Sequence, residues 1–140
     1  MTAILCLVLL SGLPRHDTCH AVAAEAQRQG VPVTVALAVG WQESRMNPDA
    51  VSKRGAVGPM QVLSKWHPGD PTEAGIALLR RLYVKHGDWH RALCGYASGV
   101  VCRPAGERYA RRVAARVLWL QLLTPGGSWP AALNPPRRLM

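Results

Sequence analysis

The sequence predicts an all-α fold. Apolar residues recur at helical spacing in several segments, and no stretch of any length alternates apolar and polar residues as a strand does. Capping residues, glycines and prolines separate these segments. With 140 residues and 49% hydrophobic content, the chain suits one small domain that buries its own core. Helices are expected over residues 18–29, 33–45, 73–86, 88–96 and 107–123.

The first two of these helices are separated by a short turn. Thr18 is the expected N-cap of the first helix, and Gly30 follows its last turn, where glycine readily adopts a positive φ. Pro32 then opens the second helix. Residues 33–39 are almost entirely apolar, which predicts a buried helix. Pro48 follows the helix and ends it, because proline disfavours helical structure in the residue before it.

The segment that follows, residues 46–64, holds several turn-forming residues and is expected to be a loop. The third helix begins with Asp70 or Thr72 as its cap and with Glu73 in its first turn. Gly87 ends it, and a short fourth helix follows. The last helix has apolar faces and one stripe of arginines, for which a solvated surface is the default interpretation. The stripe consists of Arg108, Arg111, Arg112 and Arg116.

The two ends of the chain differ from the central domain, which is expected over residues 18–123. The run at residues 1–10 is too short to span a bilayer and is similar to the core of a secretory signal, although it lacks a positively charged leader. We expect residues 1–17 to be either a signal peptide or an apolar N-terminal segment that packs on the domain. Residues 124–140 are rich in Pro and Gly and are expected to form a flexible tail.

Charge and cysteine content restrict the function. Seventeen Lys and Arg against eight Asp and Glu give a net charge of +9, so the chain should be drawn to polyanions: nucleic acid, anionic lipid or an acidic cell-wall polymer. Charge alone does not choose among these three. The cysteines and histidines lack the usual spacing of zinc ligands, so no metal is expected. Cys94 and Cys102 are close enough in sequence to form a disulfide, and two free buried thiols are the alternative.

One carboxyl group in the buried helix is the candidate catalytic group. Glu43 lies near the C-terminal end of the helix, on the face of Ala36, Val39 and Gly40. Desolvation and the negative end of the helix dipole both raise the pKa of a carboxyl at this place. A carboxyl that stays protonated near neutral pH is what a general acid requires. The ordinary alternative is a helix-end glutamate paired with Arg45 or another arginine.

Several motifs together resemble the lytic transglycosylase domain, which shares its lysozyme-like fold with goose-type lysozyme. They are Glu-Ser-Arg-Met-Asn-Pro at 43–48, Ser52, Gly-Ala-Val-Gly-Pro-Met-Gln at 55–61, Ala-Leu-Cys-Gly-Tyr-Ala-Ser-Gly at 92–99, and Tyr109. The likeness runs from about Thr18 to Val117. Two positions depart from the family: Pro59 stands where a bulky aliphatic residue is usual, and Ala97 where asparagine is common.

The resemblance implies a catalytic acid and a set of substrate-binding residues. The acid/base glutamate of the family falls on Glu43. The residues that line the sugar cleft or approach the acid fall on Ser44, Ser52, Gly58, Met60, Gln61, Tyr96 and Tyr109. Taken singly, core packing is the ordinary role of Met60 and of the two tyrosines. No cofactor is implied.

The implied reaction cleaves the β-1,4 bond between N-acetylmuramic acid and N-acetylglucosamine in peptidoglycan and leaves a 1,6-anhydro end. No second carboxylate has a motif around it, which fits a single-acid mechanism assisted by the substrate. A lysozyme-like hydrolase and a non-catalytic wall-binding module are the alternatives, and DNA binding has only the charge in its favour. We expect a monomer that acts on glycan strands in the periplasm or cell envelope, or as part of a secretion machine or phage virion.

Overall fold

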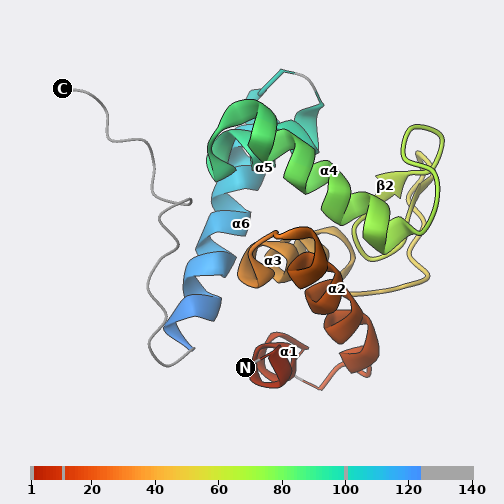
Figure 1. Ribbon diagram of the computed structural model, residues 1–140, viewed down its shortest axis with the longest axis vertical. Helices are drawn as coiled ribbons and strands as arrows, with labels where there is room; N and C mark the ends of the chain where they lie inside the picture. Colours follow the sequence, from red (N-terminus) through yellow and green to blue (C-terminus); the bar gives the residue numbers. More distant parts are fainter. Residues whose placement is uncertain (1, 11, 100, 124–140) are drawn as a thin grey trace.

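The computed structural model describes residues 2–10, 12–99 and 101–123, and it confirms the all-α fold class. The described residues form six α-helices and one short hairpin of two strands (Figure 1). The helices are α1 (Thr2–Leu10), α2 (His16–Gln29), α3 (Val33–Ser44), α4 (Pro71–His86), α5 (Trp89–Ser98) and α6 (Pro104–Leu122). The strands are β1 (Ala56–Val57) and β2 (Val62–Leu63).

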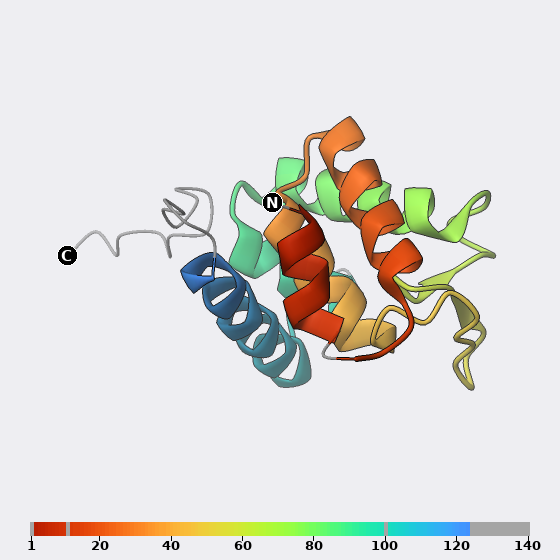
Figure 2. The ribbon, with the colours of Figure 1, turned by 90° about the horizontal axis from the view of Figure 1, so that it is seen from below.

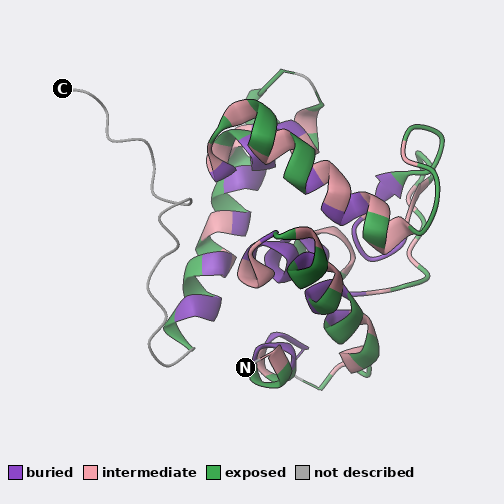
Figure 3. Cartoon of the chain, in the orientation of Figure 1, coloured by how far each residue is buried: buried purple, intermediate pink, exposed green. Residues whose placement is uncertain are grey.

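The central helix is α3, and α2 and α6 pack directly against it (Figure 1). Every residue from 35 to 40 is buried, because a helix that is apolar on all sides leaves no face for water. The remaining neighbours form a chain of contacts in which α2 packs on α4, α4 on α5, and α5 on α6. Figure 3 shows that the buried residues of these helices lie on their inward sides. The predicted buried position of residues 33–39 is confirmed for 35–39.

Local signals set most helix ends. Gly30 adopts φ 74° after α2, and Asp70 caps α4 by accepting a hydrogen bond of 2.9 Å from the Glu73 amide. The predicted cap at Thr18 is wrong, because α2 begins at His16 with Arg15 in the N-cap position. The last helix begins at residue 104, earlier than predicted, because a proline is tolerated at the first helical position, where no amide donor is needed.

The segment between α3 and α4 contains the hairpin that sequence analysis did not predict. β1 and β2 are antiparallel, with Ala56 opposite Leu63 and Val57 opposite Val62. Strands of two residues are too short to produce an alternating pattern in the sequence, so only tertiary structure reveals them. The hairpin brings residues 58–61 back toward α4, which contacts β2.

The N-terminal helix packs on the domain. α1 contacts α2 (Figure 2), and its buried side consists of Leu5, Cys6, Leu9 and Leu10. A disulfide joins Cys6 to Cys19 in α2, with 5.8 Å between the Cα atoms. This arrangement corresponds to one of the two alternatives for residues 1–17, and removal of a leader stays a prediction. No helix in the described ranges is long and apolar enough to cross a membrane.

A second disulfide joins Cys94 to Cys102, with 5.3 Å between the Cα atoms. Of the two alternatives for this pair, the structure therefore has the bonded one. The bond closes the short connection between α5 and α6. The expected tail at residues 124–140 lies outside the described residues.

Candidate active site

Glu43 lies in the last turn of α3, and its side chain is half-buried. Burial raises the pKa of its carboxyl from 4.5 to about 7, and a smaller effect of the Tyr109 hydroxyl lowers it. The last turn of α3 carries no basic residue to offset the negative end of the helix dipole. At neutral pH a large fraction of molecules therefore holds Glu43 as a neutral acid. This is the protonation state that a general acid needs.

The ordinary alternative, an ion pair with Arg45, is not present. Among the described residues Glu43 takes part in no salt bridge. The Arg45 guanidinium instead lies over Trp41, 4.8 Å from the ring centroid, and Arg116 of α6 lies 5.6 Å from the same ring. Arg15 donates a 3.0 Å hydrogen bond to the carbonyl of Arg45, which places a cation at the C-terminal end of α3.

Sequence reasoning missed the roles of Trp41 and Arg15. Neither residue belongs to a motif that points to chemistry. Their contacts arise from the packing of α6 on α3 and from the turn that leads into α2. One sequence signal was available for Arg15. The last turn of α3 has no basic residue of its own, so a cation from another segment is needed to bond the carbonyls at this helix end.

Two tyrosines from different helices stand next to Glu43. Tyr96 of α5 and Tyr109 of α6 stack with 6.5 Å between ring centroids and 16° between ring planes. Burial, and then the charge of the Glu43 carboxylate, raise the pKa of each hydroxyl well above its usual value. The Tyr109 hydroxyl is buried and has no hydrogen-bond partner at normal distance within the described structure. It remains a neutral donor beside the carboxyl, and the two groups influence each other's pKa.

Ser44 joins the end of α3 to the following loop. Its hydroxyl donates to the carbonyl of Pro59 at 2.7 Å and accepts from the amide of Asn47 at 3.1 Å. The side chain predicted to bind substrate therefore also holds residues 59–61 over the end of the helix that carries Glu43.

Tight packing of the loop explains why a glycine occupies position 58 and an apolar side chain occupies position 60. Gly58 adopts φ 77°, and a Cβ at this position would lie 2.7 Å from the Cβ of Pro71. Met60 is fully buried. It packs against Gly75 of α4, where a Cβ would come within 2.8 Å of the Met60 Cγ atom. Met60 thus forms an apolar layer between the loop and α4.

The loop is held by hydrogen bonds from three of the predicted site residues. The Tyr96 hydroxyl donates to the carbonyl of Met60 at 2.5 Å. Gln61 adopts φ 52°, and its amide nitrogen donates to the carbonyls of Ala50 and Gly58 at 3.0 and 2.8 Å. The Ser52 hydroxyl accepts from backbone amides inside the hairpin. The structure therefore brings Tyr96 and Met60 into direct contact, whereas the Ser52 side chain bonds within its own turn.

A groove of about 470 Å³ runs between the hairpin, α4 and α5. Gln61 and Tyr96 both belong to its wall. Tyr96 also belongs to the stacked pair beside Glu43, so the groove adjoins the acid. Glu43 itself is not among the residues that line it.

Most of the other acidic side chains have evident structural uses. Asp70 and Asp88 accept hydrogen bonds from backbone amides at the starts of α4 and α5. Glu25 pairs with Arg28, and Glu107 bonds to His90 at 2.6 Å. Within the described ranges none of these carboxylates shares a hydrogen bond or ion pair with a partner of Glu43. The arrangement suits chemistry that uses a single carboxyl group.

In the part of the chain that the structure describes, the set that comes closest to a metal site is Cys94, Cys102 and Glu107. One ligand atom from each lies within 4.8 Å of the others. The two sulfur atoms form a disulfide, so they offer no thiolate to a metal ion.

The family model described as the Transglycosylase SLT domain matches residues 20–69. The match covers most of α2, all of α3 with Glu43, and the loop with the hairpin. It ends before the helices that supply Tyr96 and Tyr109. Comparisons with curated proteins and with solved structures give no match. Over residues 20–69 the chain is therefore similar to the transglycosylase domain, whose lysozyme-like fold agrees with the helical structure of the described residues.

Proposed function

We propose that the chain is a lytic transglycosylase in which Glu43 acts first as acid and then as base. The bond cleaved is the β-1,4 linkage between N-acetylmuramic acid and N-acetylglucosamine, and the product carries a 1,6-anhydro end. The observation that carries the proposal is the half-buried Glu43 carboxyl, whose pKa of about 7 lets it both give and take a proton near neutral pH.

The reaction needs two steps and one carboxyl group. In the first step Glu43 protonates the bridging oxygen, the acetamido oxygen of the muramic acid attacks C1, and the N-acetylglucosamine leaves as an alcohol. In the second step the Glu43 carboxylate removes the proton from the C6 hydroxyl, O6 attacks C1, and the bond to the acetamido oxygen breaks. The acid is restored, and no water is consumed. Assistance by the substrate replaces the usual second carboxylate.

The surrounding residues have separate roles in this proposal. The neutral Tyr109 hydroxyl donates a hydrogen bond to the Glu43 carboxylate that forms after the first step. This bond limits how far burial raises the pKa of Glu43. Gln61 and Tyr96, in the groove wall, orient the acetamido group and the leaving sugar. Ser44, Ser52, Gly58 and Met60 shape the loop on which the sugars lie.

Zymography on peptidoglycan tests the catalytic role. Wild-type protein should clear the substrate, and Glu43→Gln should not, because the amide cannot protonate the bridging oxygen. Mass spectrometry of the soluble products should find anhydro ends; reducing ends in their place would indicate a lysozyme-like hydrolase. Equal clearing by both proteins contradicts the catalytic role of Glu43, and no clearing by either contradicts the proposal and favours a non-catalytic wall-binding module.

The proposed substrate also indicates where in the cell the protein acts. Peptidoglycan lies outside the cytoplasm, so we propose that the protein works in the periplasm or cell envelope, or is carried there by a phage particle or secretion machine. Both disulfides fit an oxidising compartment.

A further inference from the structure

The groove beside the tyrosine pair is lined by basic groups and by no acidic residue. Arg54 reaches it from the turn before β1, and Lys85 and His86 reach it from the last turn of α4. Arg54 and Lys85 are exposed, and neither belongs to any ion pair found in the described ranges. The groove therefore carries positive charge that the protein itself does not neutralise.

The apolar part of the groove wall strengthens the electric field that these basic groups produce in the groove. Its other side chains include a group of aliphatic residues, Val62, Leu63, Leu78 and Leu82. A cleft with one sign of charge and low-dielectric walls concentrates the field on whatever anion enters it. The His86 ring lies against α5, where its Nε2 atom would be 3.6 Å from a Cβ at Gly95, so it forms part of the wall next to Tyr96.

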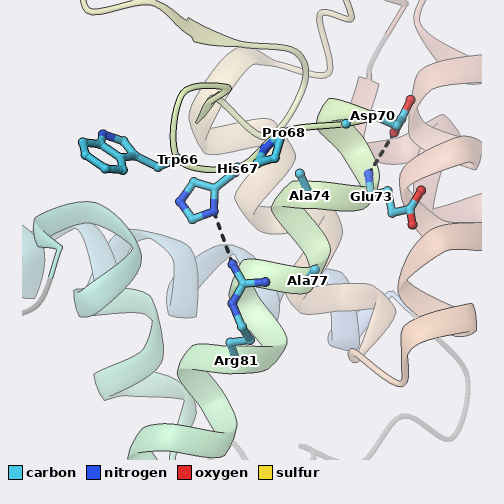
Figure 4. A pocket seen from close by; sticks show the side chains of 9 residues that line it. Trp66, His67, Pro68, Asp70, Glu73, Ala74, Ala77 and Arg81 are labelled. Carbon is cyan, nitrogen blue, oxygen red and sulfur yellow. Dashed lines mark hydrogen bonds between the residues drawn. The ribbon is translucent and has the colours of Figure 1, made fainter.

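Acidic residues line the neighbouring pockets and not the groove itself. Glu107 lines a pocket that shares His86 with the groove. The groove also includes His67. This residue also lines a neighbouring pocket of about 270 Å³ that contains Asp70 and Glu73 (Figure 4). In that pocket the His67 ring lies 3.2 Å from the Arg81 guanidinium, and Asp70 caps α4. The basic groove and the mixed-charge pocket are therefore distinct surfaces that share one histidine.

We propose that the basic groove binds carboxylate groups carried by the peptidoglycan strand, through Arg54, Lys85 and His86. This inference rests on the proposed function for the identity of the polymer. The sugar rings of the strand are uncharged, so three basic groups would add nothing to recognition of the sugars alone. The negative charges of the strand are the carboxylates of its stem peptides and, where a peptide has been removed, of its lactyl groups, because the lactyl carboxyl is otherwise amide-bonded to the peptide. The shared chemistry of these two sources is a carboxylate presented beside the cleavage site.

Binding is best measured with a variant that does not cut the strand. In the Glu43→Gln background, affinity is compared at one salt concentration for three probes. They are intact solubilised strands, strands stripped of peptides by an amidase so that only lactyl carboxylates remain, and intact strands whose carboxyls are converted to neutral amides. Intact strands should bind roughly 3- to 10-fold more tightly than the neutralised ones, the range expected for two exposed ion pairs.

Two double variants separate the groove from the general positive charge of the protein. Arg54→Ala with Lys85→Ala should remove the difference between intact and neutralised strands. Lys53→Ala with Arg111→Ala removes the same charge from exposed positions outside the groove and should preserve the difference. In the active protein the groove double variant should raise KM and leave kcat close to its original value, as expected when ground-state and transition-state binding are lost equally.

The probes also identify the source of the carboxylate. If stripped strands bind as tightly as intact ones, the groove also accepts the lactyl carboxylate that removal of the peptide frees; if they bind like neutralised strands, it reads only the carboxylates of the stem peptide. Equal affinity for intact and neutralised strands, or equal loss in the two double variants, overturns the inference. A protein that binds carboxylates in this groove but clears no peptidoglycan would contradict the proposed function and leave this inference standing.

Discussion

Replacing Glu43 by glutamine should stabilise the folded protein at alkaline pH and abolish cleavage. The folded-state pKa of about 7 lies above the ordinary value of 4.5. Between these two pH values the folded chain keeps a proton that the unfolded chain releases. The free energy of unfolding therefore falls as pH rises through this interval. Glutamine has nearly the same shape as glutamate and no charge. The free energy of unfolding of Glu43→Gln should therefore not show this fall.

The size of the effect follows from the two pKa values. Each unit of difference between the folded and unfolded pKa values is worth 1.36 kcal/mol. The free energy of unfolding of the wild-type protein therefore falls by about 3 kcal/mol between pH 4 and pH 8. Glu43→Gln should exceed the wild type by about this amount at pH 8 and approach it at pH 4. For a domain of this size, 3 kcal/mol corresponds to a rise in melting temperature on the order of 10 °C.

Urea unfolding at pH 4, 6 and 8, followed by tryptophan fluorescence with both disulfides intact, measures this difference. Glu73→Gln, which removes an exposed carboxylate from the first turn of α4, controls for the loss of one negative charge. A stability difference between Glu43→Gln and wild type that stays constant from pH 4 to pH 8 would show that the carboxyl is not desolvated in the folded state. The burial argument for a general acid would then fail.

Three further changes probe the surroundings of the acid. Tyr109→Phe removes the hydroxyl that lowers the pKa of Glu43, so the alkaline limb of the pH–activity profile should move to higher pH; an unmoved limb contradicts the contact. Gly75→Ala would stabilise a solvent-exposed helix, but here the added Cβ collides with Met60. We therefore expect urea unfolding to show a free energy of unfolding lower by about 1–3 kcal/mol. Cys19→Ala should cost about 3 kcal/mol by removing the disulfide to α1, whereas a protein whose N-terminal segment had been cleaved off would show no such loss.

Much of the fold, and Glu43 as the candidate acid, could be predicted from the sequence. The unbroken apolar run before Trp41 predicts a buried helix, and Gly30 and Asp70 are local signals that mark helix ends. Glu43 stands out because a carboxyl at the end of such a helix meets both desolvation and the helix dipole. These features depend on short stretches of chain, where propensity and periodicity act directly.

The tertiary structure decided what surrounds the acid. The contacts of Glu43 with Tyr109, and of Tyr96 with Met60, join segments from α3, α5, α6 and the loop. Sequence spacing does not reveal such contacts, because they depend on how helices pack. The same holds for the disulfide between Cys6 and Cys19, which ties to α2 a segment that resembles a leader. The pKa of a carboxyl depends on how much water those distant segments exclude, so the sequence points to Glu43 as the candidate acid, whereas the fold sets the pKa of its carboxyl.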